Sequence, residues 1–384
     1  MTEFLFWAVF ALLAYSILGY PVLLLLFARM FGRDARTEGV SPRSFSFLIA
    51  AYNEEACIRE KVLNCLSLAD AGAYDVEVIV VSDGSSDRTE DEVRAIVDPR
   101  VRLVIPEGRR GKALALNHIL PMATKEIFIF TDANSIVAPG ALEAMAHCFA
   151  DPAIGGVCGE IAVESAGSRS IARGEGFYWK YDQAMKRAET RLGGAVSAQG
   201  SFYAIRACHA APFRPDCADD FYNSVRVVAM GGRLAFERGV RATEHVTELA
   251  RKEMGRRIRS TERGWRALMA HRALMNPLKH GWYAWQLLSH KFLRRLTPFF
   301  LFALLPLNLA LTGTGPIYLV IAALQVLTYA IIAGAAMSGR FRALPVVRQL
   351  FFFAMSNLAM ALGLIRYMRG QKSTLWNPVR EQGS

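Results

Sequence analysis

The sequence lacks several patterns that would assign it at once to a common class. Its six cysteines form no C-x-x-C pair, so the sequence predicts neither a zinc ribbon nor a dithiol redox site, and we interpret the cysteines as reduced. No G-x-G-x-x-G motif follows the first apolar run, which argues against a dinucleotide-binding fold. The net charge is +11, but the basic residues form no single tract, and we expect no nucleic-acid partner.

Two long stretches of the sequence carry no charged residue. Phe4–Ala28 and Leu296–Gly339 are each long enough to span a bilayer, and Gly313–Pro316 divides the second into two spans. Gln349–Ile365 is a further apolar segment. Arginines directly follow the first stretch, so the positive-inside rule places the next domain in the cytosol. The later spans would leave the C-terminus outside, whereas its basic residues favour the inside, and the C-terminal topology stays open.

Between the apolar segments, strand and helix patterns alternate, which predicts an α/β domain with a mostly parallel sheet. The predicted strands are Phe45–Ala51, Val76–Val81, Val101–Ile105 and Ile127–Thr131, and the predicted helices are Glu54–Leu68, Asp87–Val97, Lys112–Met122 and Pro139–Phe149. We divide the chain into an N-terminal transmembrane anchor (1–30), this cytosolic domain (43–265), interfacial amphipathic helices (266–295), C-terminal transmembrane segments (296–366) and a basic tail (367–384). Aromatic residues beside basic ones favour the interfacial interpretation, with an ordinary buried amphipathic helix as the alternative.

Two of the predicted strands end in acidic and small polar residues, within the segments 80–87 and 129–135. Because the carboxyl ends of parallel strands share one edge, where ligands of open α/β sheets bind, we expect a site for a phosphorylated ligand there. Asp132 and Asn134 place two oxygen ligands two residues apart, which suits a hard divalent metal ion. Lys112 opens a predicted helix and could meet a phosphate, although a solvated lysine is the alternative.

Six short motifs follow one another in a characteristic order. They are Ala50–Glu55, Ser82–Asp87, Gly111–Leu114, Thr131–Asn134, Ala218–Phe221 and Arg256–Arg259. Together they resemble the family-two glycosyltransferases with a GT-A fold, over about residues 45–265 and most closely in the membrane-embedded branch of cellulose synthase, hyaluronan synthase and poly-N-acetylglucosamine synthase. The resemblance implies an α/β GT-A nucleotide-sugar-binding domain and hexosyltransferase activity with a nucleotide-sugar donor, by our expectation a UDP-sugar.

The resemblance also implies roles for individual residues. Asp132 and Asn134 match the metal motif D-x-D, with an amide as the second ligand, and imply Mg²⁺ or Mn²⁺. Asp220 matches the catalytic base, with Asp219 as the competing choice and a helix cap as the structural alternative for the pair. A single base implies direct displacement, and hence inversion at the anomeric carbon. The residues expected to bind the donor are Ala51, Tyr52, Asn53, Glu55, Asp83 at the uridine, Lys112, Asp132, Arg256, Arg257 and Arg259.

The acceptor side departs from the family pattern. Ser260 stands where the Q-x-x-R-W motif has the tryptophan that stacks on the acceptor sugar, so we expect short products on a saccharide or lipid-linked acceptor. Trp179 and Trp265 are the candidate acceptor-binding residues, and Trp179 is equally consistent with an aromatic cluster in the core or facing the membrane. We expect a bacterial inner-membrane protein of unspecified oligomeric state. A processive polysaccharide synthase and a non-catalytic membrane protein with a degenerate nucleotide-binding domain are the alternatives.

Overall fold

A computed structural model describes residues 1–34, 39–165, 172–246 and 250–372, without the side chains of 163–165, 172–180, 245–246 and 250–253. The described chain forms two compact units. The sheet unit comprises residues 24–246, 266–286 and 372, and the helical unit comprises Met1–Leu23, Ala250–Trp265 and Leu287–Gln371.

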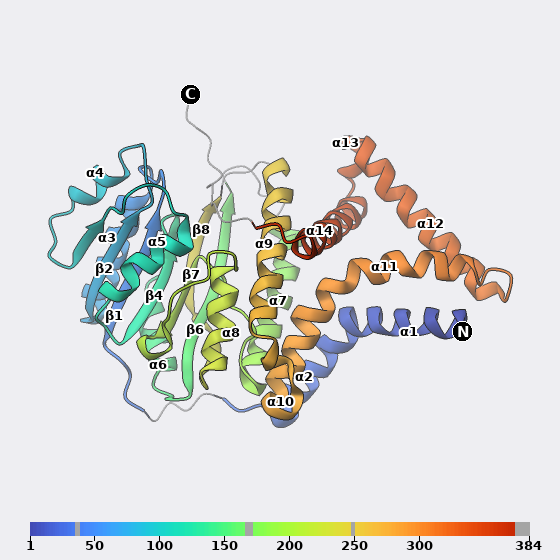
Figure 1. Cartoon of the computed structure of the whole chain (residues 1–384), viewed down its shortest axis with the longest axis horizontal. Coiled ribbons are helices and arrows are strands. Elements are labelled where there is room, and N and C mark those ends of the chain that lie inside the picture. The colour runs from blue at the N-terminus through green and yellow to red at the C-terminus, as the bar shows by residue number, and fades with distance from the viewer. Residues whose placement is uncertain (35–38, 166–171, 247–249, 373–384) are drawn as a thin grey trace. The chain divides into compact units, whose positions relative to one another are not determined.

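The sheet unit is built on an eight-stranded mixed sheet with the order β3-β2-β1-β4-β7-β6-β8-β5 (Figure 1). Its strands are β1 Ser44–Ala51, β2 Asp75–Ser82, β3 Val101–Val104, β4 Ile127–Asp132, β5 Ser135–Val137, β6 Ile154–Ser165, β7 Phe202–Arg206 and β8 Arg233–Val246. The first four strands pair in parallel, as do β6 and β8. Strand β7 is antiparallel to β4 and β6, and β5 is antiparallel to β8.

Helices cover both faces of this sheet, and β1 shows why. Phe45, Phe47 and Ile49 point into a core formed with α3 and α6, whereas Leu48 and Ala50 point into a second core formed with α5 and α8. A strand buried on both faces is apolar at nearly every position, which is what makes β1 visible in the sequence. The helical segments of the sheet unit are α3 Ile58–Gly72, α4 Thr89–Arg94, α5 Lys112–Ile119, η2 Leu120–Met122, α6 Ala141–Cys148, α7 Ala172–Leu192, η3 Ala207–His209, α8 Asp219–Ala229, η4 Arg272–Met275 and α10 Pro277–Gln286.

The helical unit contains most of the apolar sequence. Its segments are α1 Thr2–Ala14, η1 Tyr15–Gly19, η5 Leu287–Leu293, α11 Arg294–Leu309, α12 Pro316–Met337, α13 Gly339–Arg342 and α14 Pro345–Met368, while α2 Tyr20–Phe31 and α9 Ala250–Ala270 each contribute residues to both units. Among the residues that the structure describes, four helical runs are long and apolar enough to cross a membrane: Thr2–Phe31, Pro277–Leu309, Pro316–Met337 and Pro345–Met368. Their most apolar windows are only 11–28% buried, so most of their apolar side chains face outward, as a lipid environment favours.

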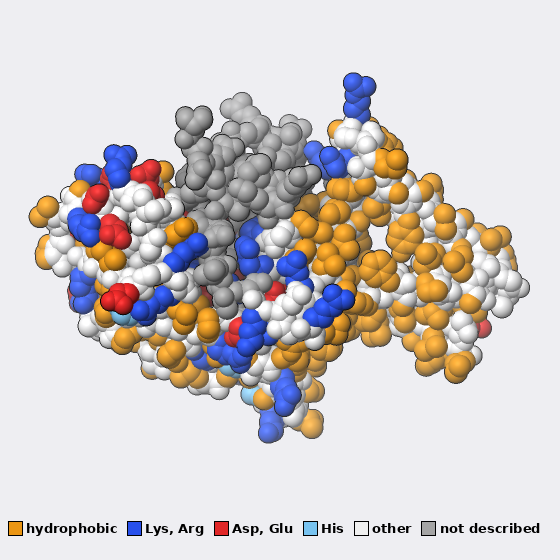
Figure 2. All heavy atoms as spheres, turned by 45° about the horizontal axis from the view of Figure 1, so that its top comes forward, with side chains coloured by type: hydrophobic (Ala, Val, Ile, Leu, Met, Phe, Trp, Pro, Cys, Tyr) orange, Lys and Arg blue, Asp and Glu red, His pale blue; other side chains and the backbone are white. Residues whose placement is uncertain are grey.

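Figure 2 shows hydrophobic side chains over the visible face of these apolar helices. The exposed large hydrophobic side chains include Phe302 on α11 and Leu319 and Leu324 on α12. The structure also joins two parts of the chain that we had separated. The segment expected at the membrane interface continues into the first C-terminal span, because Pro277–Leu309 is one helical run with a local distortion at Gly281. The break expected at Gly313–Pro316 lies between α11 and α12.

Candidate functional site

The carboxyl ends of three neighbouring strands meet at one edge of the sheet. In the register of β1 with its neighbours, Ala51 lies opposite Ser82 of β2 and Ala50 lies opposite Asp132 of β4. Asp83 follows Ser82 directly, and its backbone N–H donates to the Ala51 carbonyl at 2.9 Å. The acidic ends of β2 and β4 therefore share one edge, as the sequence predicted.

Side-chain hydrogen bonds join the loop after β1 to the loop after β2. The backbone N–H of Asn53 donates to Ser85 Oγ at 3.1 Å, and Asn53 Oδ1 accepts from the N–H of Ser86 at 2.8 Å. The N–H of Glu54 donates to Thr89 Oγ1 at 2.7 Å. Asn53 adopts a φ of 54°, a left-handed conformation that asparagine tolerates better than most residues. The loop after β1, which is predicted to bind the nucleotide, is therefore held in place by hydrogen bonds to residues 85–89, which follow β2.

Two further predicted donor-binding residues, Tyr52 and Glu55, lie on the loop after β1. The Arg109 guanidinium group lies 3.7 Å from the centre of the Tyr52 ring, in a cation–π arrangement. Glu55 is exposed and accepts from the N–H of Arg88 at 3.1 Å. The loop after β1 therefore presents an aromatic ring and an exposed carboxylate beside the sheet edge, and the loop after β3 adds the guanidinium group of Arg109.

Asp83 shapes the start of helix α5. It is 2% exposed, and its two carboxylate oxygens accept from the backbone N–H groups of Arg110 at 2.7 Å and Gly111 at 2.8 Å. Gly111 has a φ of 88°, a conformation that favours glycine, and the turn places Lys112 at the first position of α5. A carboxylate has further lone pairs, so these bonds leave Asp83 able to accept from a ligand.

Lys112 connects the two acidic motifs of the site. Its Nζ lies 2.7 Å from Asp132 Oδ1 and 3.1 Å from Asp219 Oδ2, and the three side chains are between 16% and 24% exposed. Burial lowers the pKa of Lys112, but the charges of Asp132 and Asp219 outweigh burial and hold that pKa well above its ordinary value. Beneath them, burial and the charge of Asp219 raise the pKa of Tyr203 well above its ordinary value, and its hydroxyl accepts from Asn223 at 2.9 Å.

Asp219 and Asp220 are the first two residues of α8, where negative charge interacts favourably with the helix dipole. The two carboxylates have different partners. Asp219 pairs with Lys112, whereas Asp220 Oδ1 accepts from the N–H of Phe221 at 2.7 Å. Asp220 lies over Gly200, where an added Cβ would stand 3.4 Å from its Oδ2. The two residues therefore stabilise the first turn of α8 and also line the candidate site.

The turn with the predicted metal ligands follows β4. Asp132 donates its backbone N–H to the Ser201 carbonyl at 3.1 Å, and Asn134 stands two residues further on. Two carboxylates, from Asp132 and Asp219, converge on one cation, the Lys112 ammonium group, which stands where a metal ion could bind. Within the described residues no group of three or more His, Cys, Asp or Glu side chains could hold a metal ion, and the metal role of Asp132 and Asn134 stays a prediction.

The predicted arginine cluster lies on α9, in the helical unit. Arg257 donates to Ser356 Oγ at 3.2 Å, and its guanidinium group lies 4.7 Å from the Phe352 ring centre. Burial and the charges of Arg263 and Arg256 lower the pKa of Arg259. Arg259 has no hydrogen bond or ion pair to another described residue. The charge of Glu262 opposes the lowering of the Arg259 pKa in part. The predicted diphosphate role of these arginines stays a prediction.

The two predicted acceptor tryptophans differ in their surroundings. Trp265 is 3% exposed, and its ring packs edge-on against Phe292 at 5.5 Å and stacks with Tyr367 at 6.3 Å. These contacts favour a packing role within the helical unit. Trp179 lies in α7, in the part of that helix whose side chains are outside the described residues.

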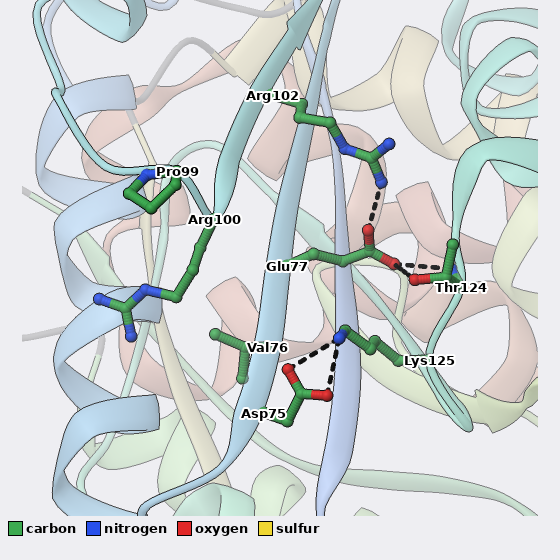
Figure 3. A pocket seen from close by; sticks show the side chains of 8 residues that line it. All are labelled: Asp75, Val76, Glu77, Pro99, Arg100, Arg102, Thr124 and Lys125. Carbon is green, nitrogen blue, oxygen red and sulfur yellow. Dashed lines mark hydrogen bonds and ion pairs between the residues drawn. The ribbon is translucent and has the colours of Figure 1, made fainter.

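A pocket at the opposite, amino-terminal edge of β2 contains a network of ion pairs (Figure 3). Glu77 contacts Arg102 and accepts from the N–H of Thr124 at 2.6 Å, while Lys125 Nζ lies 2.7 Å from Asp75. Both acidic side chains of this pocket already have cationic partners, and the network is best explained as structural.

Sequence reasoning missed two buried polar residues near the site, Tyr203 and Lys61. Lys61 is fully buried in α3, and its Nζ donates to the Ser135 carbonyl at 2.6 Å, directly after the metal turn. A signal was present, because Lys61 shares the helical face of Ile58, Val62 and Cys65, where the pattern calls for an apolar residue. Tyr203 lies in a short strand of ordinary composition, which offered no comparable signal.

Comparison with known proteins identifies the sheet unit. Residues 46–209 match the family model described as glycosyl transferase family 2. This part of the chain is therefore similar to the family 2 glycosyl transferases. A solved structure of the mannosyltransferase PcManGT from Pyrobaculum calidifontis, in complex with GDP-Man and Mn²⁺, is 24% identical, covers 95% of this chain and 99% of that chain, and superposes with a TM-score of 0.68. At this identity the likeness establishes the GT-A fold.

Two curated proteins are similar to part of this chain. A beta-monoglucosyldiacylglycerol synthase from Trichormus variabilis is 28% identical over 204 residues, which is 52% of this chain and 43% of the relative. A poly-beta-1,6-N-acetyl-D-glucosamine synthase from Staphylococcus aureus is 30% identical over 160 residues, which is 41% of this chain and 38% of the relative. The match thus spans less than half the length of each relative.

Proposed function

We propose that this protein is an inverting glycosyltransferase that moves a sugar from a nucleotide-sugar donor to a saccharide or lipid-linked acceptor at the cytosolic face of a membrane. The observation that carries the proposal is the convergence of Asp132, Lys112 and Asp219 at one sheet edge, within hydrogen-bond distance of one another through a single ammonium group. The similarity to family 2 and to the two curated proteins, a glycolipid synthase and a polysaccharide synthase, supports the same reaction class.

The donor's diphosphate needs positive charge as it leaves. Lys112 is near enough to the end of β4 to turn from the carboxylates to a phosphate, and Arg259, with Arg256 and Arg257, would supply further positive charge. Asp132 and Asn134 would hold Mg²⁺ or Mn²⁺, and such an ion supplies Lewis-acid stabilisation of the leaving diphosphate. The Mn²⁺ complex of PcManGT supports this assignment.

The nucleoside would bind between the two joined loops. The ring of Tyr52, which the guanidinium group of Arg109 backs at 3.7 Å, offers a stacking surface for a base, and Asp83 offers carboxylate oxygens at the floor. Ala51, Asn53 and Glu55 complete this loop. We expect uridine, and the GDP-Man complex of PcManGT makes guanosine the direct competitor in a test.

Asp220 would accept the proton of the attacking acceptor hydroxyl. Asp219 is engaged with Lys112, which leaves Asp220 as the better candidate of the pair. The proposed roles include one base and no carboxylate nucleophile. The acceptor hydroxyl would therefore displace the diphosphate directly, which inverts the configuration at the anomeric carbon. Its lone pairs exceed the one N–H bond to Phe221, so its position at the helix start does not prevent this role.

The acceptor would be held at the membrane. Ser260 is exposed where the related motif has a stacking tryptophan, and the burial of Trp265 makes that residue a poor substitute, which leaves Trp179 as the aromatic candidate. We therefore expect one or a few sugars to be added to a membrane-bound acceptor. The similarity to a polysaccharide synthase keeps processive synthesis as the second candidate.

The deciding experiment is a screen of radiolabelled UDP- and GDP-sugars on membranes containing the protein, with sizing of lipid-extractable and aqueous products. Transfer of one or a few sugars to a lipid-extractable product is the expected result. A polymer of tens of sugars, made by the purified protein, would establish the processive alternative. Absence of transfer and of nucleotide binding would support a degenerate domain without catalysis.

A further inference from the structure

Helix α3 places a fully buried lysine directly behind the turn that carries Asp132 and Asn134. Lys61 is 0% exposed, and its ammonium group makes one hydrogen bond, a 2.6 Å bond to the Ser135 carbonyl. No carboxylate among the described residues forms an ion pair with it. The centre of the Phe202 ring lies 6.0 Å from the same ammonium group.

Asn64, one helical turn after Lys61 on α3, also makes hydrogen bonds to the short strand β5. Its side-chain amide donates to the Val137 carbonyl at 2.9 Å, and its Oδ1 accepts from the Val137 N–H at 2.9 Å. Residues three apart share one face of a helix, so Lys61 and Asn64 act together on β5. Three hydrogen bonds therefore fix β5, Ser135–Val137, which begins immediately after Asn134.

An ammonium group at this depth is costly for folding. Burial lowers the pKa of Lys61, and the charge of Asp132 offsets only part of that effect. A buried charge with a single neutral partner destabilises a protein relative to an apolar side chain of similar size. A methionine would fill the same space without that penalty, so packing alone does not account for a lysine here.

We infer that Lys61 is a positioning residue of the donor site, which holds the Asp132–Asn134 turn in place together with Asn64. The inference rests on the proposed function, because it concerns the turn that would receive the donor and its metal ion. In the free protein, Lys112 holds Asp132 from the solvent side. Once a diphosphate engages Lys112, that support is lost, and Lys61 is the contact that keeps the turn fixed from behind.

The test compares Lys61→Met and Lys61→Gln with a matched control, Lys125→Met, which removes a lysine from the opposite edge of the sheet. Hydrogen exchange in the free protein should be about tenfold faster at residues 132–137 in Lys61→Met, while α3 and the unfolding temperature stay unchanged or the temperature rises. Affinity for UDP or GDP in the presence of Mn²⁺ should fall by about tenfold, as for other groups that support metal ligands. Lys61→Gln keeps a hydrogen-bond donor, so both the increase in exchange and the loss of nucleotide affinity should be smaller than in Lys61→Met.

Two results would overturn the inference. The first is unchanged exchange at residues 132–137 in Lys61→Met. The second is faster exchange with unchanged nucleotide affinity, which would make Lys61 a purely structural residue. If Lys61→Met does not fold, Asn64→Ala tests the same clamp through exchange at Val137. If the unchanged protein binds neither nucleotide, the proposed function fails, whereas the exchange measurement still decides whether Lys61 holds the turn.

Discussion

Replacing Lys112 by methionine should leave the carboxylates of Asp132 and Asp219 close together without the cation that now separates them. Lys112 Nζ lies 2.7 Å from one and 3.1 Å from the other, and all three side chains are mostly buried. Removing one partner of a buried ion pair costs about 3 kcal/mol in the free energy of unfolding, and partial exposure favours the lower end of the range. For a unit of this size, that loss lowers the unfolding temperature by about 6–12 °C.

Thermal unfolding of the purified protein in detergent measures this loss, with and without Mn²⁺. Mn²⁺ should stabilise Lys112→Met more than the unchanged protein, because the ion would take the place of the ammonium group between the two carboxylates. Lys125→Met is the matched control, since it removes an ion pair of 2.7 Å whose partner Asp75 is 67% exposed. An exposed pair contributes about 0–1 kcal/mol, so the control should unfold almost like the unchanged protein.

The pH dependence provides a second check. Asp132 and Asp219 raise the pKa of Lys112 in the folded protein. The stabilisation from a raised lysine pKa is fully present below the unfolded pKa, about 10.4, and is lost only as the pH rises through the higher folded value. The difference between the two proteins should therefore stay constant from about pH 6 to pH 9. Equal unfolding temperatures for Lys112→Met and Lys125→Met would refute the bridging role, and equal stabilisation by Mn²⁺ would refute the overlap with a metal site.

Further predictions concern the base, the metal ion and the cysteines. Asp220→Asn should lower turnover by about 10²–10⁴-fold with nearly unchanged nucleotide affinity in calorimetry, whereas weaker binding at normal turnover would make Asp220 a donor ligand. Chelation should abolish transfer, and Asp132→Ala should abolish it even in excess Mn²⁺; transfer that persists in chelator would exclude the metal assignment. Alkylation at about pH 7.5 should modify exposed Cys208 and spare Cys57, because burial raises the pKa of Cys57 to about 11; rapid labelling of Cys57, located by peptide mass spectrometry, would contradict its burial.

The parallel half of the sheet was predictable because its strands are buried on both faces. The strand expected at Phe45–Ala51 is Ser44–Ala51, and the strand expected at Val76–Val81 is Asp75–Ser82. Continuous apolar runs bounded by polar residues give such strands a local signal. The other half of the sheet, which combines antiparallel pairs with the parallel pair of β6 and β8, gave no such signal. Glycines interrupt β6, and its pairing with β8 shifts register near Gly156 and between Gly159 and Glu160, so neither strand shows a regular alternation.

The helix expected from Glu54 begins only at Ile58, and the reason lies outside the local sequence. Hydrogen bonds to the loop after β2 hold residues 53–55 in an irregular conformation. Those partners lie more than 30 residues further along the chain, beyond the reach of any helical periodicity. The same distance effect hid Lys61, whose partner Ser135 is 74 residues away. Local pattern therefore identified the strand ends that carry the site, and tertiary contacts decided which side chains meet there.

The charges around the Asp132–Asn134 turn suggest how two lysines would act together in the proposed donor site. The turn carries one carboxylate, from Asp132, because Asn134 replaces the second, while Lys112 stands in front of it and Lys61 behind it. With one carboxylate and two ammonium groups, the turn alone should bind a metal ion weakly, but it should bind an anion well. A diphosphate that draws Lys112 away leaves Asp132 and Asp219 without their cation, a state that a partly buried site tolerates only if another cation arrives at the same time. Donor and divalent ion should therefore bind as one complex, with Lys112 exchanging a carboxylate partner for a phosphate. Lys61 keeps the turn in position during that exchange.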